Sequence, residues 1–141
     1  MPKFGDVFRT EKDYTSTGKE AKPRWFIYLG QVSCFESPKN IYLCTTTTQM
    51  NSQRYKNVGS DSLVYFYSRG GLFESDCLIY LEDIITQFTQ NDFDEYEPVY
   101  KGNIGKDKIV EIIRKLKSAG ISNKIKKDIF AFCQLEGIST K

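Results

Sequence analysis

The segment KPRWFIYLG, Lys22 to Gly30, places two cations and a proline directly before a run of aromatic and aliphatic residues. Trp25 to Leu29 are residue types that suit a half-buried pleated surface, and Pro23 and Gly30 bound the run. The segment therefore predicts a β-strand that begins at its positively charged end. Arg24 is expected at the mouth of this strand, where a cation is either simply solvated or held for an anion.

Short strands separated by polar turns account for most of the chain as far as residue 101. We expect them at Phe4 to Thr10, Ile41 to Gln49, Ser62 to Ser68 and Asp76 to Ile84, with a sixth candidate at Glu97 to Gly102. The polar stretches Glu11 to Lys22 and Gln49 to Asp61 predict loops. Consecutive strands of this kind favour a largely antiparallel sheet that curls or closes into a small barrel.

Two amphipathic helices are expected after Gly102. Apolar residues recur at helical spacing between Lys106 and Ser118, and Gly120 is placed to end this helix. Ser122 can cap a second helix, whose apolar stripe is Ile125, Ile129, Phe132 and Cys133. The predicted fold is α+β and mainly β, with a barrel and its helix in residues 1–120 and a helical extension of the same domain in 121–141.

Length and composition are those of one globular domain. A chain of 141 residues is long enough for one core and short for two. No apolar run approaches the length of a membrane span, and Asp6 interrupts the region where a secretory signal would be apolar. We therefore expect a cytoplasmic protein with no membrane partner.

The sequence contains no histidine, which excludes Ser-His-Asp, Cys-His and two-histidine mechanisms. Its four cysteines, Cys34, Cys44, Cys77 and Cys133, form no C-x-x-C pair, so neither a zinc site nor another cofactor is expected. Cys44 and Cys77 lie in apolar stretches and are interpreted as reduced core residues. Acid–base chemistry would have to use carboxylate, lysine, tyrosine, arginine or hydroxyl groups.

Charge is distributed unevenly along the chain. Nine Lys and Arg residues stand against two acids between Lys101 and Lys127, whereas the segment Asn91 to Glu97 carries four acids and no base. A basic face of this kind suits a polyanionic or acidic partner, although lysine-rich helix faces are often just solvated.

Three segments together resemble the MazF/PemK/Kid family of bacterial toxins, whose small SH3-like barrel is shared with the gyrase poison CcdB. FGDVF (4–8) is similar to the family's first strand, KPRWFIYLG to its second, and GLFESDCLIYLEDI (71–84) to a strand with a Phe-x-x-Asp entry and an acid at its end. The helix in GNIGKDKIVEIIRKLKSAG (102–120) is similar to the family's helix. The likeness covers about residues 3–120.

The resemblance implies a metal-independent, sequence-selective endoribonuclease that cuts single-stranded RNA, forms a homodimer and is restrained by an antitoxin protein. The family's arginine, hydroxyl residue and acid correspond to Arg24, to Thr46 or Thr47, and to Glu82. An arginine fork suits a phosphate whose charge grows as the RNA 2′-hydroxyl attacks it. Glu82 would act as base, and the threonine hydroxyls would hold the non-bridging oxygens.

Further RNA contacts are expected from the two predicted loops and their neighbours. The candidates are Arg9, Lys19, Lys22, Gln49, Arg54 and Tyr55. Cations among them could compensate for a family arginine that this sequence lacks, described next, and the tyrosine could stack an unpaired base.

The sequence departs from the family pattern at two positions near this site. Pro23 precedes Arg24 instead of following it, and Ile85 occupies the place of a second arginine. Two alternatives therefore stay open: a CcdB-like toxin that binds a protein target without nuclease chemistry, and a non-catalytic SH3-like module that binds RNA or protein.

Overall fold

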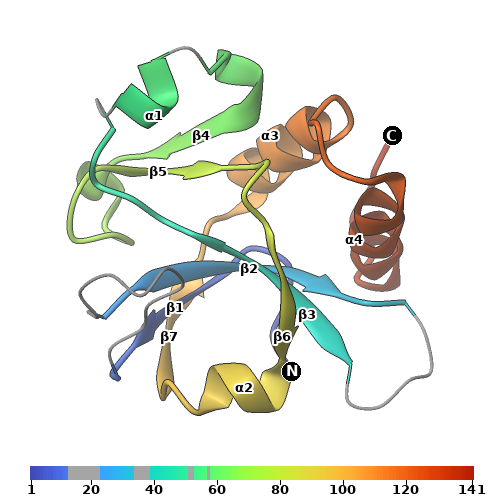
Figure 1. Ribbon diagram of the computed structural model, residues 1–141, viewed down its shortest axis with the longest axis horizontal. Helices are drawn as coiled ribbons and strands as arrows, with labels where there is room; N and C mark the ends of the chain where they lie inside the picture. The colour runs from blue at the N-terminus through green and yellow to red at the C-terminus, as the bar shows by residue number, and fades with distance from the viewer. Residues whose placement is uncertain (13–22, 34–38, 51–52, 57) are drawn as a thin grey trace.

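The structure, a computed structural model, describes residues 1–12, 23–33, 39–50, 53–56 and 58–141, without the side chains of Arg54 and Lys56. The strands of this part of the chain form two antiparallel sheets (Figure 1). The larger sheet has the order β6-β3-β2-β1-β7, with β1 Asp6–Thr10, β2 Trp25–Gln31, β3 Asn40–Thr45, β6 Ile85–Thr89 and β7 Pro98–Asn103. The smaller sheet pairs β4 Leu63–Phe66 with β5 Cys77–Tyr80.

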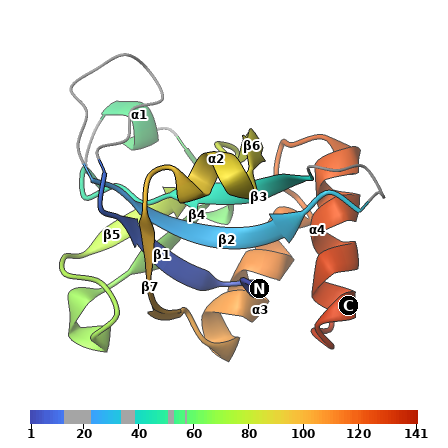
Figure 2. The same cartoon turned by 90° about the horizontal axis from the view of Figure 1, so that it is seen from below.

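Helices cover the larger sheet from different sides. Figures 1 and 2 show α2 (Gln90–Asp94) on one face, whereas β4, β5 and α3 (Lys106–Leu116) lie on the other, and α4 (Asn123–Leu135) stands at one end of β2 and β3. The buried Phe93 of α2 contacts Phe8 and Phe26, with ring centroids 5.7 and 5.3 Å apart. The remaining short turns are α1 Gln53–Lys56, η1 Ser60–Ser62 and η2 Ser68–Gly70.

The structure confirms the predicted α+β, mainly β class, but the closed barrel is wrong. Strand β3 ends at Thr45, and only the isolated bridge between Thr47 and Leu78 pairs it with the smaller sheet in the described residues. The Thr47 hydroxyl then accepts a hydrogen bond from the Gln49 N–H, so the chain turns away before a longer ladder can form. The two sheets therefore face each other without closing.

The sequence analysis missed β6 and α2. The strand predicted for Asp76 to Ile84 ends at Tyr80, where a turn closed by the Asp83 N–H and the Tyr80 carbonyl separates β5 from β6. Helix α2 begins with a capping box, since Thr89 and Asp92 each accept a hydrogen bond from the other's N–H. Part of the loop predicted for Gln49 to Asp61 forms α1 and η1, whereas the other predicted loop lies outside the described residues from 13 onward.

Helix α4 is part of the same core. Phe132 contacts Tyr28, with ring centroids 5.7 Å apart, and its ring lies 3.0 Å from where a Cβ of Gly30 would stand. Gly30 has φ +124°, so any side chain there would be strained as well as crowded. At the end of α4 the Glu136 carboxylate accepts a 2.9 Å hydrogen bond from the Phe4 N–H. Residues 121–141 therefore extend the domain.

A buried carboxylate ties α4 to the larger sheet. Asp128 accepts hydrogen bonds from the Ser33 hydroxyl at 2.7 Å, the Tyr42 hydroxyl at 2.6 Å and the Lys124 ammonium at 2.9 Å. Burial alone would raise its pKa, but these hydrogen bonds outweigh burial and lower the pKa to about 2. Asp128 is therefore ionised in the folded protein.

We expect Asp128→Asn to lower the free energy of unfolding by about 2–4 kcal/mol at neutral pH, because an amide cannot replace the charged acceptor. Since the folded pKa lies below the ordinary one, the carboxylate stabilises the fold above pH ~4 and loses this contribution as the pH falls towards ~2. Urea denaturation at a series of pH values should show that the difference in free energy of unfolding between Asp128→Asn and wild type becomes smaller as the pH falls over this range. Asp61→Asn, at an exposed acid, serves as the control; an equal pH response in both variants would contradict this role.

Candidate nucleic-acid interface

Arg24 and two threonines are held together at one end of the larger sheet. The Arg24 carbonyl accepts from the Thr10 N–H at 2.9 Å, and the Arg24 N–H donates to the Thr10 hydroxyl at 3.0 Å. The Thr46 N–H donates to the carbonyl of Trp25, and Thr47 pairs with Leu78 on the opposite side. The main chain therefore fixes Arg24, Thr46 and Thr47 at this strand end, as three of the four predicted catalytic residues.

The Arg24 side chain is available to an anion. In the described part of the chain, its guanidinium has no carboxylate partner, and its recorded hydrogen bonds are those of the main chain. By contrast, several lysines of α3 and α4 are paired: Lys108 and Lys115 lie 3.3 and 3.1 Å from Glu111, and Lys124 lies 2.9 Å from Asp128. Those lysines stabilise the fold, whereas Arg24 has no such role.

A row of aromatic rings leads from Trp25 across the gap between the two sheets. Trp25 contacts Phe73 at 5.5 Å between centroids, and Phe73 contacts Phe66 at 5.0 Å. Cations lie over both ends of this aromatic row: Lys101 stands 6.0 Å from the Trp25 ring centre, and Lys108 stands 5.4 Å from that of Phe66. Aromatic rings with cations at both ends suit a single-stranded nucleic acid, whose bases stack and whose phosphates are negative.

Two tyrosines are well exposed, one beside this row and one on the opposite face of the larger sheet, where α2 packs. Tyr67 follows Phe66 in the chain and is 47% exposed, and the Arg69 guanidinium stands 5.5 Å from its ring centre. Tyr100 in β7 is 58% exposed and contacts Phe8. Both rings leave a face or edge open to a base, whereas Phe66 and Phe73 are almost completely buried and act as support.

Glu82, the fourth predicted catalytic residue, makes its contacts away from the strand end that holds Arg24. Strand β5 runs from Cys77, near the aromatic row, to Tyr80, and Glu82 follows this far end. One Glu82 carboxylate oxygen accepts a 2.9 Å hydrogen bond from the Ser62 hydroxyl, and the other lies 2.8 Å from the position of a Cβ on Gly120. The contacts of Glu82 are thus with η1 and the α3–α4 connection, whereas those of Arg24 are with β1.

The predicted RNA-binding residues divide into three groups. Arg9 lies opposite Trp25 in the sheet register, and Gln49 follows Thr47, so both belong to the neighbourhood of Arg24. Tyr55 packs against Tyr80, with ring centroids 6.1 Å apart, on the smaller sheet. Lys19, Lys22 and the side chain of Arg54 lie outside the described residues.

Sequence reasoning missed Lys101, Arg69 and the role of Phe73, whereas Tyr67 is one of several tyrosines that the sequence offers for stacking a base. A signal was available for the cations, because each stands within two residues of an aromatic strand or turn residue. The contact between Trp25 and Phe73 joins residues 48 positions apart (73 − 25), so only the folded chain reveals it.

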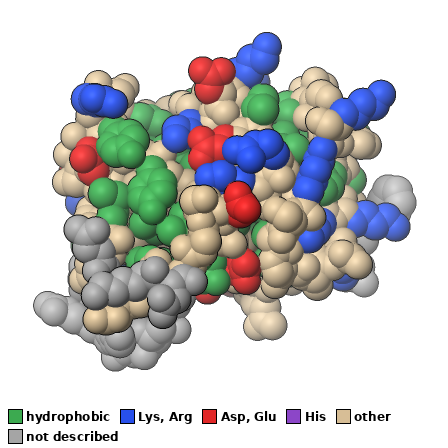
Figure 3. Space-filling view, turned by 90° about the horizontal axis from the view of Figure 1, so that it is seen from above, with side chains coloured by type: hydrophobic (Ala, Val, Ile, Leu, Met, Phe, Trp, Pro, Cys, Tyr) green, Lys and Arg blue, Asp and Glu red, His purple; other side chains and the backbone are tan. Residues whose placement is uncertain are grey.

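Figure 3 shows how charge and apolar groups divide over one face of the molecule. Hydrophobic side chains gather on the left, where β4 and α1 lie in Figure 1, and Lys and Arg side chains are frequent on the right, where α3 and α4 lie. The basic face expected from Lys101 to Lys127 is thus partly a helix surface at some distance from Arg24. Lys101 is the member of that segment that lies beside the aromatic row.

Thiol and metal chemistry find no support in the described residues. Burial raises the pKa of Cys44 and Cys133 to about 12. Burial also raises that of Cys77 to about 11, with a hydrogen bond from the Thr46 side chain partly opposing it. No three side chains of the His, Cys, Asp and Glu types gather to hold a metal ion within the part of the chain that the structure describes. None of the helices described is long and apolar enough to cross a bilayer.

The sequence matches no protein-family model, and a comparison with curated proteins gives no match either. A function can therefore be proposed only from the geometry of the site.

Because the thiolate is the reactive form, Cys44, Cys77 and Cys133 should resist alkylation in the folded protein near neutral pH. We expect iodoacetamide to modify them only after denaturation, as measured by mass spectrometry of the individual cysteine peptides. Rapid modification of Cys77 in the folded protein would show instead that the thiol next to Thr46 is open to solvent and chemically active.

Proposed function

We propose that this protein is a toxin-type endoribonuclease that binds single-stranded RNA along the aromatic row and cuts it at Arg24. The observation that carries the proposal is the strand end itself, where the main chain holds two threonines and an arginine that has no carboxylate partner among the described residues. The open pair of sheets would then be a relative of the SH3-like toxin fold. This proposal retains the resemblance to the MazF/PemK/Kid family as a hypothesis.

The proposed reaction uses the RNA's own 2′-hydroxyl. Its oxygen attacks the adjacent phosphorus while a water molecule accepts its proton, and the bond to the 5′-oxygen breaks while that oxygen takes a proton from water. The products carry a cyclic 2′,3′-phosphate and a 5′-hydroxyl. Arg24 would neutralise the charge that grows on the phosphorane, and a fixed donor of this kind lowers the barrier by ~3–4 kcal/mol. The Thr47 hydroxyl would donate to a non-bridging oxygen, and the Thr46 hydroxyl would do so in place of its hydrogen bond to Cys77.

The position of Glu82 modifies the mechanism implied by the resemblance. Its contacts with Ser62 and Gly120 separate it from the strand end, so Glu82 is an unsuitable base for a phosphate bound at Arg24. We therefore assign the rate enhancement mainly to electrostatic stabilisation by Arg24 and the threonines. We expect the enzyme to be slow, because Ile85 occupies the position of the family's second arginine. Ile85 pairs with Leu43 in the sheet and adds no positive charge to the site.

The partners follow from the same chemistry. An antitoxin would cover the unpaired cations with an acidic or aromatic peptide, in the manner of RNA. We further propose a homodimer in the cytoplasm, as in the family that the chain resembles.

A second candidate is a module that binds without cutting, either a CcdB-like toxin with a protein target or an RNA-binding protein. The contacts of Glu82 favour it, because the acid that the resemblance implies as base is bonded to Ser62 and not to the strand end that holds Arg24. Such a protein would keep the aromatic row and its cations while leaving RNA intact.

The deciding experiment is cleavage of a long single-stranded RNA in EDTA by the purified protein, with the ends of the products mapped. We expect sequence-selective cuts with cyclic 2′,3′-phosphate ends and no cleavage of a 2′-deoxy substrate. Arg24→Ala should lower the rate by a factor of about 10²–10³. Glu82→Gln should leave the rate close to that of wild type, because its carboxylate lies at η1.

Arg114→Ala, at an exposed arginine of α3, is the matched control and should cleave normally. Since the recorded contacts of Arg24 are made by its main chain, the Arg24→Ala variant should unfold at the temperature of wild type. A folded wild-type protein that arrests cell growth but leaves every RNA intact would exclude the nuclease and favour a protein target. Loss of cleavage in Glu82→Gln would instead restore the carboxylate as base.

A further inference from the structure

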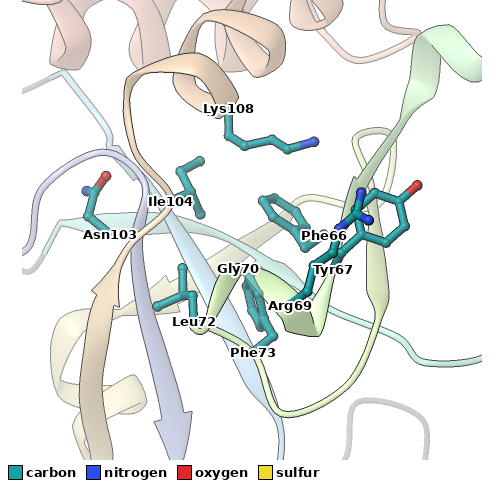
Figure 4. A pocket seen from close by; sticks show the side chains of 9 residues that line it. All are labelled: Phe66, Tyr67, Arg69, Gly70, Leu72, Phe73, Asn103, Ile104 and Lys108. Carbon is teal, nitrogen blue, oxygen red and sulfur yellow. The ribbon is translucent and has the colours of Figure 1, made fainter.

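A pocket opens at the end of the aromatic row that lies farther from Arg24. It encloses about 300 Å³ between η2, the start of α3 and the end of β7 (Figure 4). Its floor is apolar, with Phe66, Leu72, Phe73 and Ile104. Leu72 is fixed there by β7, because a Cβ on Gly102 would stand 2.8 Å from it.

Two cations and a tyrosine form the rim of this pocket. Figure 4 shows the Lys108 side chain extending across one side and Arg69 next to the Tyr67 ring on another. Lys108 lies over the Phe66 ring and is paired with Glu111, whereas the Arg69 guanidinium has no carboxylate partner in the described residues. An apolar floor with a cationic rim fits a flat aromatic group that carries a phosphate.

We propose that this pocket receives one unpaired nucleobase of the RNA, with Arg69 on a neighbouring phosphate and Tyr67 against the base. The inference rests on the proposed RNA-binding function and deepens it. Phe73 connects the two parts of the site, since it contacts Trp25 on one side and lines the pocket on the other. A strand bound at Arg24 and following the row would arrive at the pocket, so this base lies a few nucleotides from the cut. The pocket thereby contributes to the choice of RNA sequence.

Two glycines provide a matched test. Gly70 lines the pocket, and a Cβ added there has no atom within 4 Å, so a leucine can be introduced at the pocket without a clash of its Cβ. Gly59 also has open space around a Cβ and an ordinary extended backbone, with φ −65° and ψ 151°, but does not line the pocket. Gly70→Leu is therefore the variant designed to obstruct the pocket, and Gly59→Leu controls for an added surface leucine.

The measurement is the dissociation constant of a short 2′-O-methyl RNA, which cannot be cleaved, and of an abasic ribose-phosphate oligomer of the same length. We expect Gly70→Leu to weaken RNA binding about tenfold or more and to leave abasic binding unchanged, because the lost contact is made by a base. Gly59→Leu should bind both as wild type does. Arg69→Gln should reduce the slope of log affinity against log salt by about 0.7, the share of one phosphate on a single strand.

The outcomes separate this assignment from the proposed function. RNA binding that Gly70→Leu leaves unchanged would overturn the base pocket while the nuclease proposal stands, and equal weakening of the abasic oligomer would also overturn it. A wild-type protein that binds neither oligomer would overturn both. Thermal denaturation of the two leucine variants verifies that each is folded before binding is compared.

Discussion

The two hydrogen bonds between Thr47 and Leu78, 2.9 and 3.0 Å long, join the smaller sheet to the larger one. Because Thr46 also bonds to Trp25, one short segment after β3 sets the position of both sheets at once. Trp25 is then close enough to contact Phe73, and the aromatic row, the strand end at Arg24 and the pocket all depend on this junction. A barrel closed by longer pairing would leave less room between the sheets for this opening.

Cations in this protein serve two purposes, and the structure separates them by their partners. Lys115 is nearly buried and donates to the carbonyls of Ser60 and Leu63 as well as pairing with Glu111, so it ties η1 to α3. Lys101 and Arg69 instead lie over aromatic rings, Arg24 precedes Trp25 in the chain, and the described residues offer none of the three a carboxylate. A cation that is engaged in an ion pair within the fold is not available to an anionic ligand, whereas these three side chains could bind one.

Much of the fold could be predicted from local sequence patterns. The strand at Trp25–Gln31 and the helices at Lys106–Leu116 and Asn123–Leu135 follow hydrophobic periodicity and end at residues suited to caps or turns. The break between β5 and β6 could not be located, because Leu81 and Ile84 prolong the apolar pattern of Cys77 to Tyr80 past the turn. Arg24, Thr46 and Thr47 could be grouped in advance, but a strand-end acid such as Glu82 could not be placed. Its side of the molecule depends on how far β5 runs before it turns, which the local pattern does not specify.

The pocket could not be predicted from the sequence for the same reason, because local patterns do not specify which distant segments meet. Its floor combines residues of β4, the β4–β5 connection and the chain entering α3, which meet through contacts such as those of Leu72 with Gly102 and of Phe66 with Phe73. No single segment carries a periodic or compositional signal for such a cavity. The cations at its rim are also held before any ligand arrives: Arg69 lies over Tyr67, and Lys108 lies over Phe66. Side chains that are already ordered lose little entropy on binding a phosphate, so a small number of them can orient a flexible single strand. In the RNA complex proposed above, these pre-positioned cations and the pocket would favour single-stranded over paired nucleic acid, since only unpaired bases can turn into the pocket.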